Sequence, residues 1–123
     1  MSKRRRNIIK EKSFEFAVDI IKVYKYLVNE KKEFVLSKQL LRSGTSIGAN
    51  AREAVNAESK NDFTYKLSIA QKETDESLYW LELLKESHYL SPSVFELLHK
   101  SAEELLKIIK SIILTTKEAN RYE

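Results

Sequence analysis

Glu96 and His99 have the residue types and spacing of metal ligands. They are three residues apart, the spacing with which di-iron helical bundles present a glutamate and a histidine on one helix face. Such centres need a second Glu-x-x-His pair, and the sequence contains none. We therefore expect no metal and no cofactor, and we interpret Glu96 as a helix-capping residue and His99 as a surface residue.

Three glutamates, Glu53, Glu73 and Glu76, are the candidates for acid–base chemistry. If they face one another across two helices, their pKa values can split into an acid and a base. Arg42 and Arg52 lie close enough in the sequence for an ion network to be the favoured interpretation. The predicted polar network that fixes helix register consists of Arg42, Asn50, Glu53 and Glu73.

Other catalytic groups are scarce. The chain has no cysteine and two histidines, His88 and His99. Disulfides and thiolate metal sites are therefore excluded, and a general base of the usual kind is poorly supplied. Neither a phosphate-binding glycine loop nor a Ser–His–Asp set can be assembled. The sequence predicts that the protein is not an enzyme.

Positive charge is concentrated at the N-terminus. The net charge is +4, but residues 1–12 hold six basic side chains and one acidic side chain, leaving the rest of the chain at −1. We expect an arm over 1–12, a helical domain over 13–118 and a tail over 119–123. The arm is either a solubilising tail or a nucleic-acid contact. In the second case the predicted phosphate contacts are Lys3, Arg4, Arg5, Arg6 and Lys10.

Apolar spacing predicts four helices. The first is expected to begin between residues 8 and 13 and to end near 29, and the second to run from 34–37 to 59. Asn61 or Asp62 caps the third, and Ser91-Pro92 starts the fourth. Short connections predict an antiparallel up-down-up-down bundle. In the first helix, alternating steps of three and four residues predict a core-facing heptad series, Phe14, Ala17, Ile21, Tyr24 and Val28, which Ile20 and Leu27 widen.

Gly44 and Gly48 lie within the small-residue stretch 39–53 of the second helix. A glycine inside a helix costs about 1 kcal/mol relative to alanine. Because glycine has no side chain, close packing by another helix could offset this cost, and we expect such a helix there. The predicted contact is a narrow part of the third helix that includes Thr74. The residues predicted to form this close packing are Gly44, Gly48, Ala70 and Ser77.

The same stretch carries a family resemblance. Residues 39–54, QLLRSGTSIGANAREA, and further matches over 57–84 resemble the four-helix-bundle family encoded in intervening sequences of bacterial 23S rRNA genes. Ala54 stands where many members have glycine. The resemblance implies a ring-like homopentamer. It also implies kinship with a retroelement accessory protein, which is a basic pentamer that binds nucleic acid and a reverse transcriptase.

These patterns favour a non-enzymatic, oligomeric protein associated with RNA or DNA. The alternative is a protein-interaction scaffold that binds no nucleic acid. No apolar run approaches the length of a membrane span, about 20 residues, so we expect a cytoplasmic protein without a membrane partner. Tyr65, Tyr79, Trp80 and Tyr89 are candidates for base stacking, although aromatic residues at helical spacing more often form core or interface.

Overall fold

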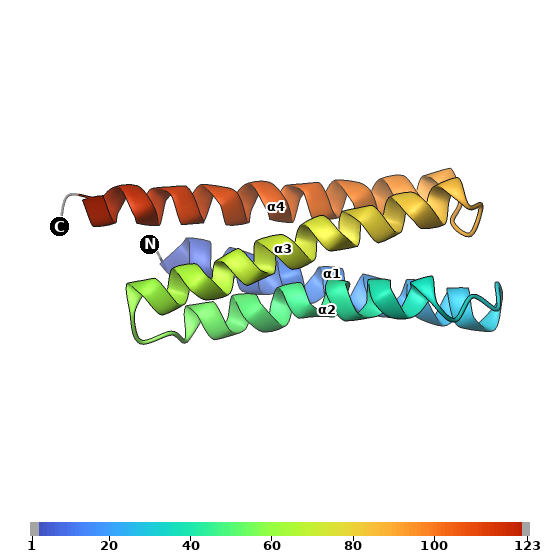
Figure 1. The fold of residues 1–123 in the computed structure, drawn as a ribbon, viewed down its shortest axis with the longest axis horizontal. Coiled ribbons are helices and arrows are strands. Elements are labelled where there is room, and N and C mark those ends of the chain that lie inside the picture. Colours follow the sequence, from blue (N-terminus) through green and yellow to red (C-terminus); the bar gives the residue numbers. More distant parts are fainter. Residues whose placement is uncertain (1–2, 122–123) are drawn as a thin grey trace.

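The computed structural model describes residues 3–121, with side chains from 3 to 119. The described chain is all-α, with no strand, which confirms the predicted fold class. Successive helices run in opposite directions, and the two ends of the chain lie at the same end of the molecule (Figure 1). The helices are α1 (Lys3–Asn29), α2 (Leu36–Val55), α3 (Lys60–Glu86) and α4 (Pro92–Arg121).

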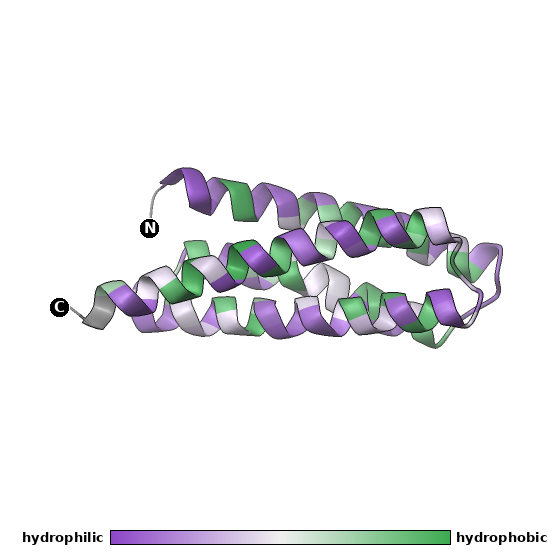
Figure 2. Ribbon diagram, turned by 90° about the horizontal axis from the view of Figure 1, so that it is seen from above, coloured by the Kyte–Doolittle hydropathy of each residue, from purple (hydrophilic) through white to green (hydrophobic). Residues whose placement is uncertain are grey.

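The four helices pack side by side in one bundle, and each helix has two neighbours. Within the described chain α1 packs on α2 and α4, and α3 packs on the same two helices, whereas the backbones of the two diagonal pairs stay further apart. Hydrophobic and hydrophilic residues alternate along each helix (Figure 2), as expected of helices that bury one face. This is the arrangement of an up-down-up-down bundle.

The N-terminal helix begins earlier than predicted. It starts at Lys3 and not between residues 8 and 13, so the expected arm forms, from Lys3 onward, the first turns of α1. Ser13 is therefore not a cap. It is fully buried, and its Oγ donates a hydrogen bond to the Ile9 carbonyl at 2.6 Å. Ile9 is itself fully buried, and its burial holds these first turns on the bundle.

The main apolar series predicted to face the core from α1 was wrong, although Ile20 and Leu27, predicted to widen it, are fully buried. Phe14 is 57% exposed and Ile21 is 40% exposed. A second series with similar spacing enters the core instead, and its members are Ile9, Ser13, Phe16, Ile20 and Leu27. The earlier helix start decides between the two, because it adds Ile9 to the second series. The first series is left on the outside of α1.

The two glycines do permit a close helix approach, but the approaching helix is α1 and not α3. A Cβ atom at Gly44 would lie 2.8 Å from Cγ1 of Ile20, and one at Gly48 would lie 3.3 Å from the Ser13 carbonyl oxygen. The narrow part of α3 meets α2 on another side, where the Ser77 hydroxyl donates to Ser43 Oγ at 2.9 Å. Adjacent positions on α2 point about 100° apart, so Ser43 and Gly44 serve different neighbours.

Two helix ends also differ from the prediction. The second helix stops at Val55, before residue 59. Ser59 caps α3, because its Oγ accepts a hydrogen bond from the Asp62 backbone N–H at 3.1 Å. The start of α4 is confirmed, with Pro92 at the first helical position and the Val94 N–H donating to Ser91 Oγ at 3.3 Å.

The N-terminus of α2 is capped by Glu33, a residue that the sequence analysis missed. Its carboxylate is nearly buried and accepts the backbone N–H groups of Val35, Leu36 and Ser37 at 2.9, 2.8 and 2.7 Å. Burial raises the pKa of Glu33, whereas these hydrogen bonds lower it. Together the hydrogen bonds outweigh burial, so the net pKa lies below the ordinary glutamate value. The carboxylate thus satisfies N–H groups that have no partner within the helix.

We expect Gly44→Ala to destabilise the protein by up to about 2 kcal/mol. The new methyl group would overlap the branched, fully buried Ile20 side chain, and such overpacking costs roughly 1–3 kcal/mol, while the gain in helix propensity returns about 1 kcal/mol. Urea unfolding measures the difference. Gly48→Ala is the matched control and should lose less, because its tightest contact is 3.3 Å. A Gly44→Ala protein that loses no more stability than Gly48→Ala would refute the close-packing argument.

We expect Glu33→Gln to reduce the free energy of unfolding by about 1 kcal/mol near neutral pH, the usual value of an N-terminal cap. Because the folded-state pKa of Glu33 is lowered, its contribution is present above the unfolded pKa of about 4.3 and is lost as pH falls through the folded-state pKa. The difference in free energy of unfolding between Glu33→Gln and wild type should therefore become smaller in acid.

Urea unfolding across this pH range tests the cap. Glu30→Gln is the control, because Glu30 lies in the same connection and is exposed. A gap that does not change with pH, or an equal loss in the control, would show that Glu33 does not act as described.

Candidate nucleic-acid interface

The predicted phosphate contacts lie on the first turns of α1. Lys3, Arg4 and Arg6 are exposed. Arg5 is partly buried against α4, where its Nη2 donates a hydrogen bond to Ser111 Oγ at 2.8 Å. Lys10 lies further along the helix and on another side, at the edge of a groove over α1 and α2. The structure thus gathers the four consecutive cations at the end of the bundle and separates Lys10 from them.

The position of these cations on α1 is electrostatically unfavourable for the isolated helix. The N-terminus of a helix carries the positive end of its dipole, and a nearby cation costs typically 0.3–1 kcal/mol. The first turn of α1 contains no acidic residue to offset this. Bound phosphate would relieve both the repulsion among the cations and the repulsion from the dipole.

Two later parts of the chain extend this positive surface. Lys107 of α4 lines a hollow of about 340 Å³ together with Arg5, Ile8 and Ser111. Lys60, at the start of α3, lines a second hollow of about 290 Å³ with Arg5, Arg6 and one acidic residue, Glu58, so that its cations outnumber its carboxylates. We call this cationic surface the basic end, and it consists of Lys3, Arg4, Arg5, Arg6, Lys60 and Lys107.

Lys60 and Lys107 were not among the predicted contacts. They are distant in sequence from the N-terminus. Lys60 begins α3 and Lys107 lies halfway along α4, and the packing of the helices brings each to a hollow that Arg5 also lines. The topology itself was predicted, so combining it with the position of each lysine along its helix would have identified them.

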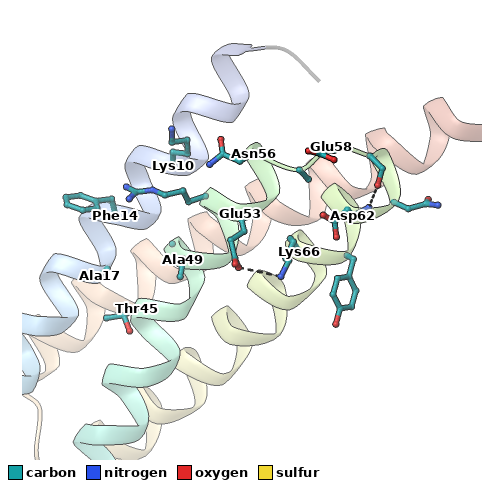
Figure 3. A pocket seen from close by; sticks show the side chains of 16 residues that line it. Lys10, Phe14, Ala17, Thr45, Ala49, Glu53, Asn56, Glu58, Asp62 and Lys66 are labelled. Carbon is teal, nitrogen blue, oxygen red and sulfur yellow. Dashed lines mark hydrogen bonds and ion pairs between the residues drawn. The ribbon is translucent and has the colours of Figure 1, made fainter.

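The groove that Lys10 borders is electrostatically different. It has a volume of about 1250 Å³ and runs over α1 and α2 to the start of α3 (Figure 3). Its floor contains small residues, among them Ala17, Gly48 and Ala49. Its cationic residues are balanced by as many acidic ones, and these charged residues are Lys10, Arg52, Lys66, Glu53, Glu58 and Asp62. A neutral groove attracts a polyanion weakly, so the basic end is the better candidate.

The four residues of the predicted polar network do not form one connected network but make separate contacts. Arg42 donates to Glu73 at 3.0 Å and also to Glu76, which in turn accepts a hydrogen bond from the Trp80 indole at 3.2 Å. The hydrogen bond from Arg42 lowers the pKa of Glu76, against a smaller opposing effect of burial. Both carboxylates are thus bound to one guanidinium, which is an ion network joining α2 to α3 and not an acid–base pair.

Asn50 and Glu53 lie outside this network. The Asn50 amide donates to the Ser46 carbonyl at 2.9 Å within α2. Glu53 pairs with Lys66 of α3 at 3.6 Å. Asn50 therefore makes a local contact, whereas Glu53 joins α2 to α3, as Arg42 and the Ser43–Ser77 hydrogen bond also do.

His99 does not pair with Glu96. Its Nδ1 lies 2.8 Å from Glu103, and its Nε2 lies 3.3 Å from Glu82 on α3. Among the described residues no group of three or more histidine, cysteine, aspartate or glutamate side chains is arranged to hold a metal ion.

The aromatic candidates for base stacking are all on α3 or just after it. Tyr65 and Tyr79 are exposed, and Tyr79 meets Trp80 edge-on with ring centroids 5.1 Å apart. Tyr89 packs against the core. None of the four lines the hollows of the basic end.

None of the described helices is long and apolar enough to span a lipid bilayer.

Comparison with known proteins agrees with the fold. A crystal structure of a protein of unknown function from the S23 ribosomal protein family of Bacteroides thetaiotaomicron VPI-5482 is similar, with a TM-score of 0.87 and 54% sequence identity over 89% of this chain and 97% of that one. No curated protein matches. Residues 5–111 match the family described as 23S rRNA-intervening sequence protein, and the chain belongs to that family.

Proposed function

We propose that the protein is a non-enzymatic, self-associating helical bundle that binds RNA through its basic end. The observation that carries the proposal is the placement of exposed Lys3, Arg4 and Arg6 at the dipole-positive start of α1. This placement costs folding energy and is suited to phosphate. The family description refers to 23S rRNA, which makes RNA the first polyanion to test.

Binding of this kind depends on phosphate contacts. Lysine and arginine side chains displace counterions from the backbone and position the protein without reading sequence. Lys107 and Lys60 widen the contact beyond the first turns of α1. The homopentamer implied by the family resemblance would multiply a weak site, because linked sites bind with avidity.

A protein-interaction scaffold is the second candidate. It is favoured by the neutral groove of about 1250 Å³ and by the exposed side chains Phe14, Tyr65 and Tyr79. Capture of a protein partner that persists at high salt, without bound RNA or DNA, would support it over the first proposal.

The test of RNA binding neutralises the basic end without disturbing the core. Deleting residues 1–12 is unsuitable, because it would remove fully buried Ile9. A triple variant, Lys3→Gln, Arg4→Gln and Lys107→Gln, changes exposed residues on α1 and α4. We expect weaker RNA binding, and a slope of log affinity against log salt that is shallower by roughly 0.7 for each lost contact to single-stranded RNA.

The matched control makes the same charge change away from the basic end. It is Lys22→Gln, Lys31→Gln and Lys100→Gln, all exposed positions, and it should keep wild-type affinity and slope. Fluorescence anisotropy with a labelled RNA gives both quantities. Equal losses in the two triple variants, or no measurable binding by wild type, would overturn the proposal.

A further inference from the structure

The hollow beside Lys60 lies at the end of the bundle where α1 and α3 begin and α2 ends. We call it the end hollow. It has a volume of about 290 Å³ and is lined by residues of all four helices and of the connection between α2 and α3. This volume is close to the lower limit of small-molecule pockets, about 300–1,000 Å³. The end hollow is therefore the size for one small group.

The floor of the end hollow is an open part of the core. Phe63 is the first member of a series along α3 whose later members are all buried, and these are Leu67, Ala70, Thr74, Ser77, Leu81 and Leu84. Phe63 itself is only half-buried and lines the hollow, as Val55 and Ala57 do. Beneath them lie the buried side chains of Ala54 and Ile112. The floor thus presents an aromatic ring and aliphatic carbon.

The rim of the end hollow carries an excess of positive charge. Arg5, Arg6 and Lys60 line it together with one carboxylate, that of Glu58. The hydrogen bond of 2.8 Å from Arg5 to Ser111 holds that guanidinium at this end of the bundle. Both α1 and α3 begin here, so the positive ends of two helix dipoles add to the charge of the side chains.

We infer that the end hollow takes one unpaired nucleotide of an RNA chain, with its base against Phe63 and its phosphates at the cationic rim. The inference rests on the RNA binding proposed above and specifies the form of RNA that the basic end selects. A nucleotide joins a flat, largely apolar base to a charged phosphate. The end hollow joins an apolar floor to a cationic rim over the same short distance, so the two are complementary in both parts.

This arrangement discriminates against double-stranded RNA. In a duplex the bases are paired and stacked, and mainly phosphates and 2′-hydroxyl groups reach a protein surface. An unpaired base at an end, a loop or a bulge leaves the stack and packs on an aromatic side chain. Phosphate contacts alone do not favour single strands, because a duplex has the higher charge density. A preference for single-stranded RNA therefore reports on the end hollow and not on the cations alone.

The first test compares an unstructured RNA strand with a blunt duplex of the same length. Wild type should bind the single strand more tightly. Phe63→Leu should weaken binding of the single strand by roughly fivefold, the lower end of what one stacked base contributes, and leave duplex binding and the salt slope unchanged. Phe95→Leu is the matched control, because Phe95 is also half-buried against the core but begins α4 at the other end. It should behave as wild type does.

A second variant leaves the aromatic ring in place and fills the space above it. Ala119 is exposed and lines the end hollow, so Ala119→Leu should also weaken binding of the single strand while every cation is retained. Circular dichroism should show unchanged helix in all three variants. Equal binding of the two RNAs by wild type, or losses in Phe63→Leu that Phe95→Leu reproduces, would overturn the inference.

A further measurement asks whether the base is recognised. Adenosine 5′-monophosphate and ribose 5-phosphate carry the same phosphate, and only the first has a base. Titration with adenosine 5′-monophosphate should shift the methyl NMR signals of Val55, Ala57 and Thr116, which line the hollow, and ribose 5-phosphate should shift them far less. Equal shifts from both compounds, or no shift from either, would contradict a nucleotide site.

The outcomes separate this inference from the proposed function. A wild-type protein that binds single strand and duplex equally, and whose salt slope falls in the triple variant at Lys3, Arg4 and Lys107, would refute the nucleotide site and leave the basic end as an RNA contact. A wild-type protein that binds neither RNA would refute the proposed function and the inference with it.

Discussion

The close approach of α1 to α2 at Gly44 is the constraint on which the rest of the structure depends. Ile20 occupies the space where a Cβ of residue 44 would lie. Together with the burial of Ile9, this contact fixes the rotation of α1 about its own axis, so that Phe16 and Ile20 enter the core. The same rotation turns Phe14 and Ile21 outward. The outer surface of α1 is therefore a direct consequence of a packing detail inside the bundle.

The helices and their order were predictable, because long amphipathic patterns and the proline at 92 are local signals. The face of α1 that enters the core was not predictable, because two apolar series with nearly the same spacing overlap along this helix. Burying an isoleucine is worth roughly 1.5–3 kcal/mol and offsets much of the cost of the four cations at the helix N-terminus, about 0.3–1 kcal/mol each. Ile9 therefore extends the helix through its basic residues, an outcome that depends on the tertiary contact and not on the local sequence.

The candidate site was predictable in part for related reasons. Lys3 to Arg6 stand out as a charge run, whereas Lys60 and Lys107 join them through the folded topology. Glu33 was missed because the usual capping residues are serine, threonine, aspartate and asparagine. The longer glutamate side chain reaches the N–H groups of α2 from the preceding turn, and no short-range pattern distinguishes it from a surface glutamate.

The stretch that carries the family resemblance is occupied by structural contacts. Its glycines admit α1, Ser43 bonds to α3, and Arg42 joins two glutamates of α3. These side chains are thereby committed to holding helices together. A binding function must then use other surfaces, and the basic end is the one whose charge suits a polyanion. Its residues lie on α1, α3 and α4, outside the stretch 39–53, so RNA bound there would leave the contacts of α2 with its neighbours undisturbed.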